Sequence, residues 1–138
     1  MGRILAVDDE VDMLSLLKMI VESYSDHQVT VVNNPLEAVE LLQQEFFDII
    51  LTDLKMPGID GIELLEKVQQ IRPNAIVIVI TAFGSLESAE EATRKGAFDY
   101  ITKPFRKEQI LMALDKARRW QELTAQNEEL RKKLDQPS

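Results

Sequence analysis

The sequence predicts an α/β domain built on a doubly wound, five-stranded parallel sheet. Five short apolar runs alternate with five helical patterns over about the first 118 residues. Most of the apolar runs are continuous rather than alternating with polar residues, which is typical of parallel strands covered by helices on both faces. Because crossovers between parallel strands are right-handed, the expected strand order is 2-1-3-4-5.

The first strand is expected at residues 3–7, and a helical period begins at Val11. The apolar face of this first helix is predicted to contain Met13, Leu14, Leu17, Ile20, Val21 and Tyr24. A second strand around residues 29–32 leads to Asn34-Pro35. That pair is a strong helix start, because asparagine caps well and proline suits the first helical position.

The third strand is the apolar run Ile49-Ile50-Leu51, which ends at Thr52-Asp53. Pro57-Gly58 makes a turn, and Asp60 can cap a helix that starts at Gly61. In open α/β sheets, ligands bind at the carboxyl ends of the strands. Asp53 taken alone therefore has two interpretations, a cap of the turn or helix and a site residue.

The second half of the chain repeats the pattern twice. A fourth strand is expected at residues 75–80. Ser85 can cap a helix that runs to Lys95, and Gly96 is a natural C′ residue. A fifth strand is expected at residues 97–101, and the last helix begins near Lys107. The five units together give a flavodoxin-like arrangement.

Composition and charge exclude several classes of function. The chain has no cysteine and one histidine, which excludes disulfides, thiolate metal sites and histidine-rich metal sites. Residues 1–105 carry 8 Lys and Arg against 18 Asp and Glu, a net charge of −10, which argues against nucleic-acid binding by this segment. No apolar run approaches the ~20 residues that cross a bilayer, and the N-terminus lacks a signal-peptide layout. We expect a soluble, cytoplasmic protein.

Polar residues at the strand ends form a candidate site. Asp8 and Asp9 follow the first strand, Asp53 the third, Thr81 the fourth and Lys103 the fifth. Since parallel strands all point the same way, these residues share one edge of the sheet. Clustered carboxylates repel one another, and Mg²⁺, which prefers oxygen ligands, would relieve that repulsion. An ammonium and a hydroxyl beside them suit phosphoryl transfer, with Asp53 as the acceptor.

Each of these residues also has an ordinary structural interpretation. Asp9 can cap the first helix with Asp12 three positions on, Thr81 can be a strand-end hydroxyl, and Lys103 can be a solvated surface lysine. Two enzymes on the same fold are rival interpretations of the whole set. A flavin protein would need hydroxyls and glycines where the chain has Asp-Asp-Glu, and an aspartyl-phosphate hydrolase would need a second acid/base carboxylate and a substrate lid.

The chain resembles the receiver domain of two-component response regulators, which implies a CheY-like fold. The matching segments are VDDE at 7–10, LTDLKMPGIDG at 51–61, ITAFGS at 80–85 and GAFDYITKPF at 96–105. Their order and spacing are those of the family. The last two segments are most similar to receivers of NtrC-type transcription activators, which act with sigma-54 polymerase.

The resemblance implies a switch rather than an enzyme, limited to accepting a phosphoryl group and slowly losing it. Asp53 would accept that group from a phosphohistidine on a sensor histidine kinase. The implied Mg²⁺ ligands are Asp8, Asp9, Asp53 and the backbone carbonyl of Lys55. The implied phosphoryl contacts are Thr81 and Lys103, and the implied switch residues are Thr81 and Tyr100. The Lys103-Pro104 peptide bond is cis in such domains.

The NtrC-type resemblance also implies an ATPase domain and a DNA-binding domain downstream of the receiver. No P-loop pattern occurs in the 138 residues, so we expect this chain to be an excised regulatory module. One departure from the expected pattern is Arg106, which is a poor cap for the last helix and leaves its start in doubt.

The C-terminal segment contains a pattern of its own. We expect a receiver domain at residues 1–118 and a helical linker at 119–138. In the linker, apolar and amide residues alternate at spacings of three and four, as in a heptad repeat: Trp120, Leu123, Asn127, Leu130 and Leu134. This pattern favours a dimerising coiled coil, and hence a homodimer. The alternative is a single helix kept polar by i,i+4 charge pairs.

Overall fold

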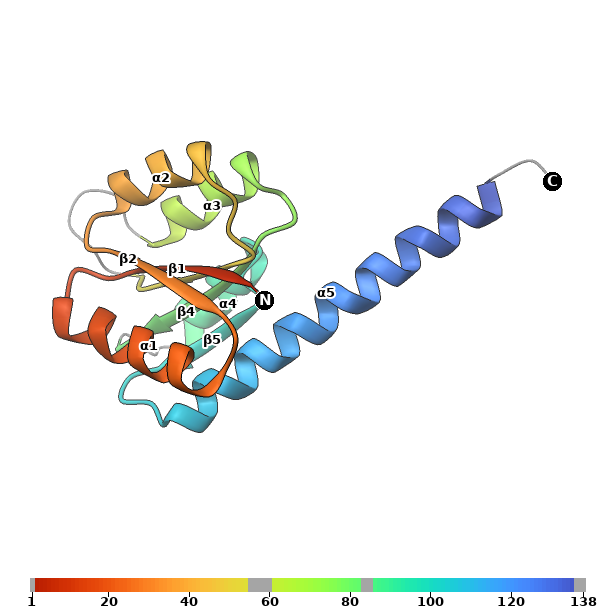
Figure 1. Cartoon of the computed structure of the whole chain (residues 1–138). Helices are drawn as coiled ribbons and strands as arrows, with labels where there is room; N and C mark the ends of the chain where they lie inside the picture. Colours follow the sequence, from red (N-terminus) through yellow and green to blue (C-terminus); the bar gives the residue numbers. More distant parts are fainter. Residues whose placement is uncertain (1, 55–60, 83–85, 136–138) are drawn as a thin grey trace.

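The computed structural model describes residues 2–54, 61–82 and 86–135, in which strands and helices alternate strictly (Figure 1). The strands are β1 (Arg3–Val7), β2 (Gln28–Val32), β3 (Ile49–Thr52), β4 (Ile76–Thr81) and β5 (Asp99–Thr102). The helices are α1 (Val11–Tyr24), α2 (Pro35–Gln44), α3 (Gly61–Ile71), α4 (Leu86–Arg94) and α5 (Lys107–Asp135). All strand pairs are parallel and their order is β2-β1-β3-β4-β5, which confirms the predicted fold class.

Two apolar layers enclose the sheet. Alternate residues of β1 point to opposite faces, so Ile4 and Ala6 pack with α1 and α5, while Leu5 and Val7 pack with α2 and α3. Figure 1 shows α1 and α5 on one side of the sheet and α2 and α3 on the other. β3 and β4 are buried along their whole length, as expected for central parallel strands.

The fifth strand is shorter than predicted because its expected first residues belong to the end of α4. Gly96 has φ +105°, and its N–H donates to the Thr93 carbonyl at 3.1 Å. The N–H of Ala97 donates to the Ala92 carbonyl at 2.9 Å, which completes a Schellman motif. Pairing with β4 therefore begins only at Phe98, whose N–H donates to the Val77 carbonyl at 2.8 Å. The predicted range 97–101 for this strand starts two residues too early and ends one residue too early, and β4 lies one residue later than predicted.

Two details of α1 also differ from the sequence prediction. Its N-cap residue is Glu10, with no side-chain cap bond, so the alternative that Asp9 caps this helix is wrong. Tyr24, predicted on the apolar face, is 57% exposed because it lies in the last turn, beyond the packed part of the helix. Its ring lies under the Lys107 ammonium at 4.5 Å, and its hydroxyl is 3.0 Å from that ammonium.

The starts of α2 and α5 show two ways of capping a helix. Asn34 caps α2 as predicted, since its side-chain oxygen accepts from the Leu36 N–H at 2.8 Å. At α5, the side-chain oxygen of Gln109 accepts the N–H of Arg106 at 2.8 Å, which is the reciprocal half of a capping box. This bond fixes the start of α5 although Arg106 itself is a poor cap. The predicted caps Asp60 and Ser85 lie outside the described residues.

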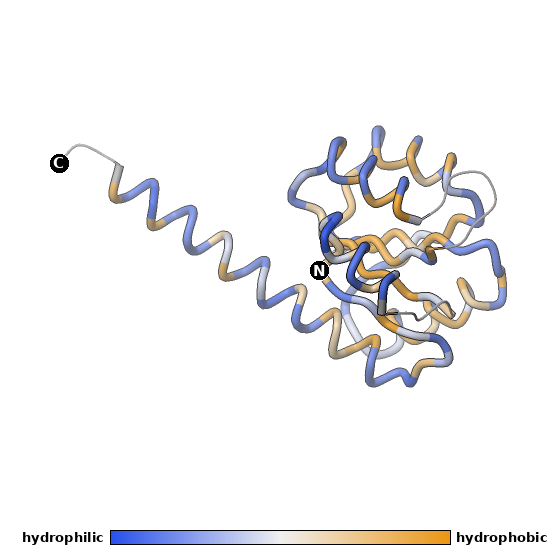
Figure 2. Tube along the Cα trace, turned by 180° about the vertical axis from the view of Figure 1, so that it is seen from behind, coloured by the Kyte–Doolittle hydropathy of each residue, from blue (hydrophilic) through white to orange (hydrophobic). Residues whose placement is uncertain are grey.

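Helix α5 is one continuous helix of 29 residues that extends far beyond the sheet. Figure 2 shows that apolar residues concentrate within the domain, whereas the protruding part of α5 is mostly hydrophilic with isolated apolar positions. Those positions include Leu123, Leu130 and Leu134, which are 60%, 57% and 83% exposed. A search of the described residues finds no helix with the length and apolarity needed to span a membrane.

The edge strand β2 is tied to α1 by a pair of charged side chains. The Lys18 ammonium donates to the Val29 carbonyl at 2.8 Å, and the Glu22 carboxylate accepts the Val29 N–H at 3.0 Å. The two side chains also pair with each other at 3.3 Å. The backbone N–H of Val29 is the main cause that lowers the pKa of Glu22 below 4.5; burial opposes this effect, and Lys18 assists it.

We predict that Glu22→Gln destabilises the chain in a pH-dependent way. Because the folded-state pKa of Glu22 is depressed, its carboxylate contributes stability that is present above pH 4.5 and is lost as the pH falls through the folded value. The urea midpoint of the variant should lie below that of the parent near neutral pH, and the gap should close in acid. Glu40→Gln, an exposed glutamate on α2, is the matched control. A gap that does not depend on pH would contradict the prediction.

Candidate functional site

The register of the sheet places the candidate site at the carboxyl ends of β1 and β3. Val7 pairs with Thr52, so the residues that follow them, Asp8 and Asp53, leave the sheet side by side. The backbone holds both positions: the N–H of Asp53 donates to the Val7 carbonyl at 3.3 Å, and the N–H of Asp8 donates to the Val32 carbonyl at 3.3 Å. The strand order alone therefore brings these two carboxylates together.

A glycine at the start of α3 allows that helix to pack against the end of β3. The N–H of Gly61 donates to the Leu54 carbonyl at 2.7 Å. A Cβ atom at position 61 would overlap the carbonyl oxygen of Asp53 and the Cα atom of Leu54. The close approach therefore requires glycine, and it helps to fix the backbone that carries Asp53.

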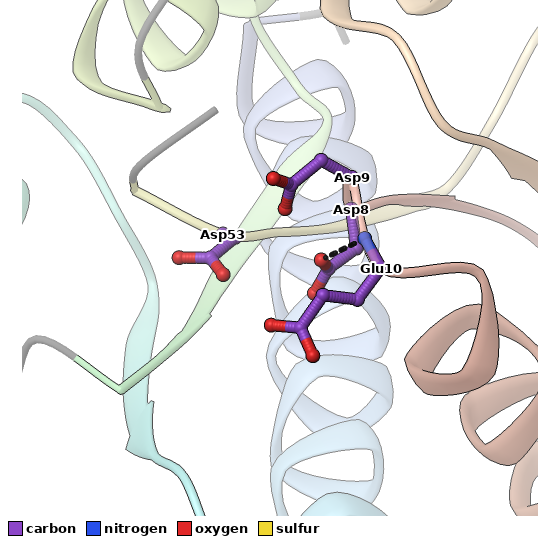
Figure 3. Close-up of side chains that lie close together, drawn as sticks. All are labelled: Asp8, Asp9, Glu10 and Asp53. Carbon is purple, nitrogen blue, oxygen red and sulfur yellow. Dashed lines mark hydrogen bonds between the residues drawn. The ribbon is translucent and has the colours of Figure 1, made fainter. Parts of the chain in front are cut away.

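Four carboxylates gather at this edge, two of them buried (Asp8 and Asp53) and two exposed (Asp9 and Glu10). One oxygen atom of each lies within 4.8 Å of the others. Figure 3 shows the four side chains, which come from two neighbouring segments of the chain. The structure thus brings together the three aspartates that the sequence placed at this edge.

Glu10 is the member of this group that the sequence analysis missed. Its N–H donates to Asp8 Oδ1 at 2.9 Å, the bond drawn in Figure 3. Its side chain makes no cap bond to α1 although it occupies the N-cap position. The sequence does contain a signal for Glu10. It directly follows the two aspartates of VDDE, and it stands at the N-cap position, where glutamate is not among the preferred residues.

The Lys103 ammonium lies between the buried carboxylates. Its Nζ atom is 2.8 Å from Asp8 Oδ2, 2.9 Å from Asp53 Oδ2 and 3.8 Å from Glu10 Oε1. Only 8% of the side chain is exposed, so the interpretation of Lys103 as a solvated surface lysine is wrong. The peptide bond to Pro104 is cis, as the family resemblance implied.

Burial and ion pairing have opposite effects on the pKa values of Asp8 and Lys103. Burial would lower the pKa of Lys103, but its hydrogen bonds to Asp8 and Asp53 outweigh that effect and raise it. Burial is also the main cause that raises the pKa of Asp8, against the opposing effects of Lys103 and the Glu10 N–H. The ionised form of Asp8 is therefore held at a cost, and one ammonium faces four carboxylates in this group.

The donor set fits a hard divalent cation. Carboxylate oxygens are the ligands that Mg²⁺ takes from proteins, usually one or two of them together with waters and phosphate oxygens. The buried pair Asp8 and Asp53 and the exposed Asp9 could supply such ligands, and added positive charge would relieve their mutual repulsion. The proposed carbonyl ligand, Lys55, lies outside the described residues.

The two predicted switch residues lie on the strands beside this group. Thr81 ends β4, is fully buried, and accepts the Lys103 N–H at its carbonyl at 2.8 Å. Tyr100 lies in the middle of β5 and is partly buried. Burial and, after it, the negative charge of Asp53 raise the pKa of the Tyr100 phenol. The Tyr100 phenol is thus within the electrostatic influence of Asp53, and the backbone of Thr81 is bonded to that of Lys103.

The comparisons with known proteins agree with this geometry. A family model described as "Response regulator receiver domain" matches residues 4–115. The transcriptional regulatory protein ZraR of Klebsiella oxytoca is 33% identical over 114 residues, which cover 83% of this chain but only 26% of ZraR. This chain therefore spans only part of the length of that relative.

Two solved structures are similar over most of the chain. The beryllofluoride-activated NtrC4 receiver domain dimer has a TM-score of 0.80 at 34% identity and covers 85% of this chain and 96% of its own. NtrX from Brucella abortus has a TM-score of 0.90 at 27% identity and covers 99% of this chain and 31% of its own. The second match includes nearly all of α5.

We predict that Asp8→Asn stabilises the metal-free chain by on the order of 1 kcal/mol near neutral pH. Because the folded-state pKa of Asp8 is raised, ionising this carboxyl costs stability, and the cost appears as the pH rises from 3.8 through the folded value. An asparagine avoids that cost, so its advantage in urea unfolding should grow with pH across this window.

Saturating Mg²⁺ should reverse the order of stability, because the parent retains a charged ligand that the variant lacks. Asp115→Asn, an exposed ion-pair partner on α5, should change stability by less than about 0.5 kcal/mol in either buffer. A variant less stable than the parent without metal would contradict the sign derived from the pKa.

Proposed function

Since the chain belongs to the response regulator receiver domain family, we propose that it is a phosphorylation-operated switch with Asp53 as its phospho-acceptor. The observation that carries this proposal is the Lys103 ammonium held between Asp8 and Asp53. A buried carboxylate beside a fixed cation can attack phosphorus while that cation compensates the charge of the incoming phosphoryl oxygens. We propose a phosphohistidine of a sensor histidine kinase as the donor.

The transfer would proceed by in-line displacement. An oxygen of Asp53 attacks the phosphorus atom, the bond from phosphorus to the donor nitrogen breaks, and its electron pair leaves with the imidazole. Asp8, Asp9, Asp53 and the Lys55 carbonyl would hold Mg²⁺, which when bound neutralises charge on the phosphoryl oxygens. The Lys103 ammonium, already 2.9 Å from Asp53, would contact one of these oxygens, and the Thr81 hydroxyl would contact another. Water would later hydrolyse the acyl phosphate slowly. In this proposal the chain modifies only itself and is not an enzyme with a separate substrate.

The switch would follow from a change of partners at the site. When a phosphoryl group modifies Asp53, Lys103 and the Thr81 hydroxyl gain a new anion to bind. Movement of Thr81 would open space for Tyr100, whose environment already depends on the charge of Asp53. Such a change is a population shift, since the modified site favours the state in which these contacts are made.

We propose that this chain is the receiver of a longer NtrC-type transcription activator in the cytoplasm. Residues 1–118 would be the receiver domain, residues 119–138 a helical linker, and an ATPase domain that acts with sigma-54 polymerase and a DNA-binding domain would follow. The support is the partial coverage of ZraR and of NtrX, together with a helix that continues well past the sheet. In this proposal the receiver itself contacts neither nucleic acid nor membrane.

The two rival interpretations have less support. A flavin phosphate would meet four carboxylates after β1 and β3, which would repel it. A hydrolase would need an acid/base carboxylate with access to substrate. In the described part of this group, two carboxylates face solvent, those of Asp9 and Glu10, and the Glu10 side chain is 66% exposed. No feature of the described residues favours either enzyme over the switch.

We predict that acetyl phosphate with Mg²⁺ adds one phosphoryl group to the chain, on Asp53, and that EDTA prevents the reaction. Intact-mass and peptide mass spectrometry measure both the stoichiometry and the position. Asp53→Asn should accept no label while its circular dichroism spectrum stays that of the parent. Equal labelling of that variant, or labelling that ignores chelation, would remove the basis of the proposed function.

The heptad pattern of α5 suggests how two copies of the chain could assemble. Leu123, Leu130 and Leu134 are exposed in the single chain, and a parallel pair of helices would bury them. Asn127 would then face its own copy across the two-fold axis. The beryllofluoride-activated NtrC4 receiver domain, which is similar to this chain, is itself a dimer. We therefore propose a homodimer in which α5 pairs with its copy.

We predict that Leu130→Lys weakens the homodimer at least about tenfold, because a buried charge without a partner opposes pairing. Ala125→Lys, exposed on the same helix but off the heptad positions, should leave the dissociation constant nearly unchanged. Sedimentation equilibrium of the full chain measures both. The prediction is wrong if the parent is a monomer at micromolar concentration or if the two variants behave alike.

A further inference from the structure

Helix α5 contacts the domain beyond the predicted domain end at residue 118. The Trp120 ring lies edge-on to the Phe98 ring, with centroids 6.0 Å apart and planes at 63°. The next residue, Gln121, donates from its side-chain amide to the Asp48 carbonyl at 3.1 Å. Phe98 immediately precedes β5 and Asp48 immediately precedes β3, so α5 is fastened at the amino-terminal edge of the sheet.

Trp120 therefore has two roles that the heptad pattern does not separate. It is the first apolar position of the heptad, and it is also a packing partner of the domain. Its exposed fraction is 48%, compared with 60% for Leu123 and 83% for Leu134. The edge-on geometry is one that aromatic pairs prefer. One part of the indole is thus covered by Phe98, and the remainder stays accessible to a second helix.

The strand between Phe98 and Lys103 connects this contact to the candidate site. β5 is an edge strand with β4 as its one neighbour in the sheet. Backbone bonds tie both of its ends to β4: the N–H of Phe98 donates to the Val77 carbonyl at 2.8 Å, and the N–H of Lys103 donates to the Thr81 carbonyl at 2.8 Å. At about 3.3 Å per residue, the strand spans roughly 16 Å between the two residues.

Backbone bonds at both ends favour movement of this short strand as a unit, so we expect a displacement at one end to reach the other. Lys103 is fixed by Asp8 and Asp53, and it must change partners if Asp53 is modified. A second link, the ion pair of Asp99 and Lys116 at 3.6 Å, also joins β5 to α5. Since both side chains of this pair are partly exposed, we expect the aromatic contact to be the more important link.

We propose that the Phe98–Trp120 contact transmits the state of the Asp53 site, through β5, to the part of α5 that extends from the domain. This inference rests on the proposed function, because it requires Asp53 to change state. Trp120 is then a positioning residue: its packing on Phe98 sets how α5 leaves the domain and how much of the indole a second chain can bury. In this proposal the site at the carboxyl ends of the strands is coupled to α5 at their amino-terminal ends.

The test uses the emission of Trp120, the only tryptophan of the chain. Beryllium fluoride with Mg²⁺ is added to the full chain as an analogue of the acyl phosphate. Bound fluoride is followed by ¹⁹F NMR and the indole by its emission maximum. We expect the emission maximum to shift with the same concentration dependence as the bound ¹⁹F signal, and to shift equally when the protein is diluted below its dimer dissociation constant.

Two substitutions at one position provide the matched comparison. Phe98→Leu removes the ring but keeps an apolar side chain, and it should retain the ¹⁹F signal while losing the emission shift. Phe98→Tyr keeps the ring and should retain both. Leu123→Ala, which removes an exposed heptad leucine, should also leave the shift of the diluted protein intact.

The outcomes separate this inference from the function on which it rests. Failure of beryllium fluoride to bind would overturn the proposed function, and the coupling with it. Binding without an emission shift, or a shift that Phe98→Leu preserves, would overturn the coupling alone. A shift that disappears on dilution would show that Trp120 reports only pairing of chains, and would also overturn the coupling.

Discussion

The structure of the site depends on one buried ammonium. Lys103 directly follows β5, and the two carboxylates that it joins directly follow β1 and β3, so a single side chain links the carboxyl ends of three strands. Without a cation, Asp8 and Asp53 would be two buried like charges a few ångströms apart, an arrangement that costs several kcal/mol. The fold keeps these charges because the lysine compensates part of their repulsion. The remaining negative charge is of the kind that a bound divalent cation would compensate.

This imbalance also explains why a receiver domain can act as a switch. If the charges of Asp8, Asp53 and Lys103 were fully balanced, a phosphoryl group on Asp53 would provide a smaller driving force for rearrangement. Here the raised pKa of Asp8 shows that its ionised form is held at a cost, while Lys103 is shared between two anions. A new anion on Asp53 would change that sharing, and β5 contains Tyr100 and leads directly into Lys103. The edge strand β5 is therefore the one closest to the change in charge.

The topology and most element positions could be predicted from the sequence, because continuous apolar runs separated by helical periods allow few other folds. The errors have local causes. Ala97 and Phe98 are apolar in either role, so the pattern could not show that Ala97 completes the cap of α4. Glu10 follows two aspartates, and from the sequence alone it could belong either to the acidic motif VDDE or to the start of α1.

The geometry of the site could not be predicted to this level. The bond between Lys103 and Asp8 joins residues 95 positions apart and depends on the register of every strand between them. Likewise, spacings of three and four predict a buried helix face but not the partner that buries it. For Trp120 one partner is Phe98 of the same chain.

The ties between Lys18, Glu22 and Val29 have a consequence for how copies of this protein can meet. The outward N–H and C=O groups of an edge strand are normally unpaired. They can form hydrogen bonds with a strand of another molecule, which extends the sheet between molecules. At Val29 both groups are already occupied by side chains of α1. The outward edge of β2 is thereby blocked at this position, so a strand of another molecule could not pair along its full length.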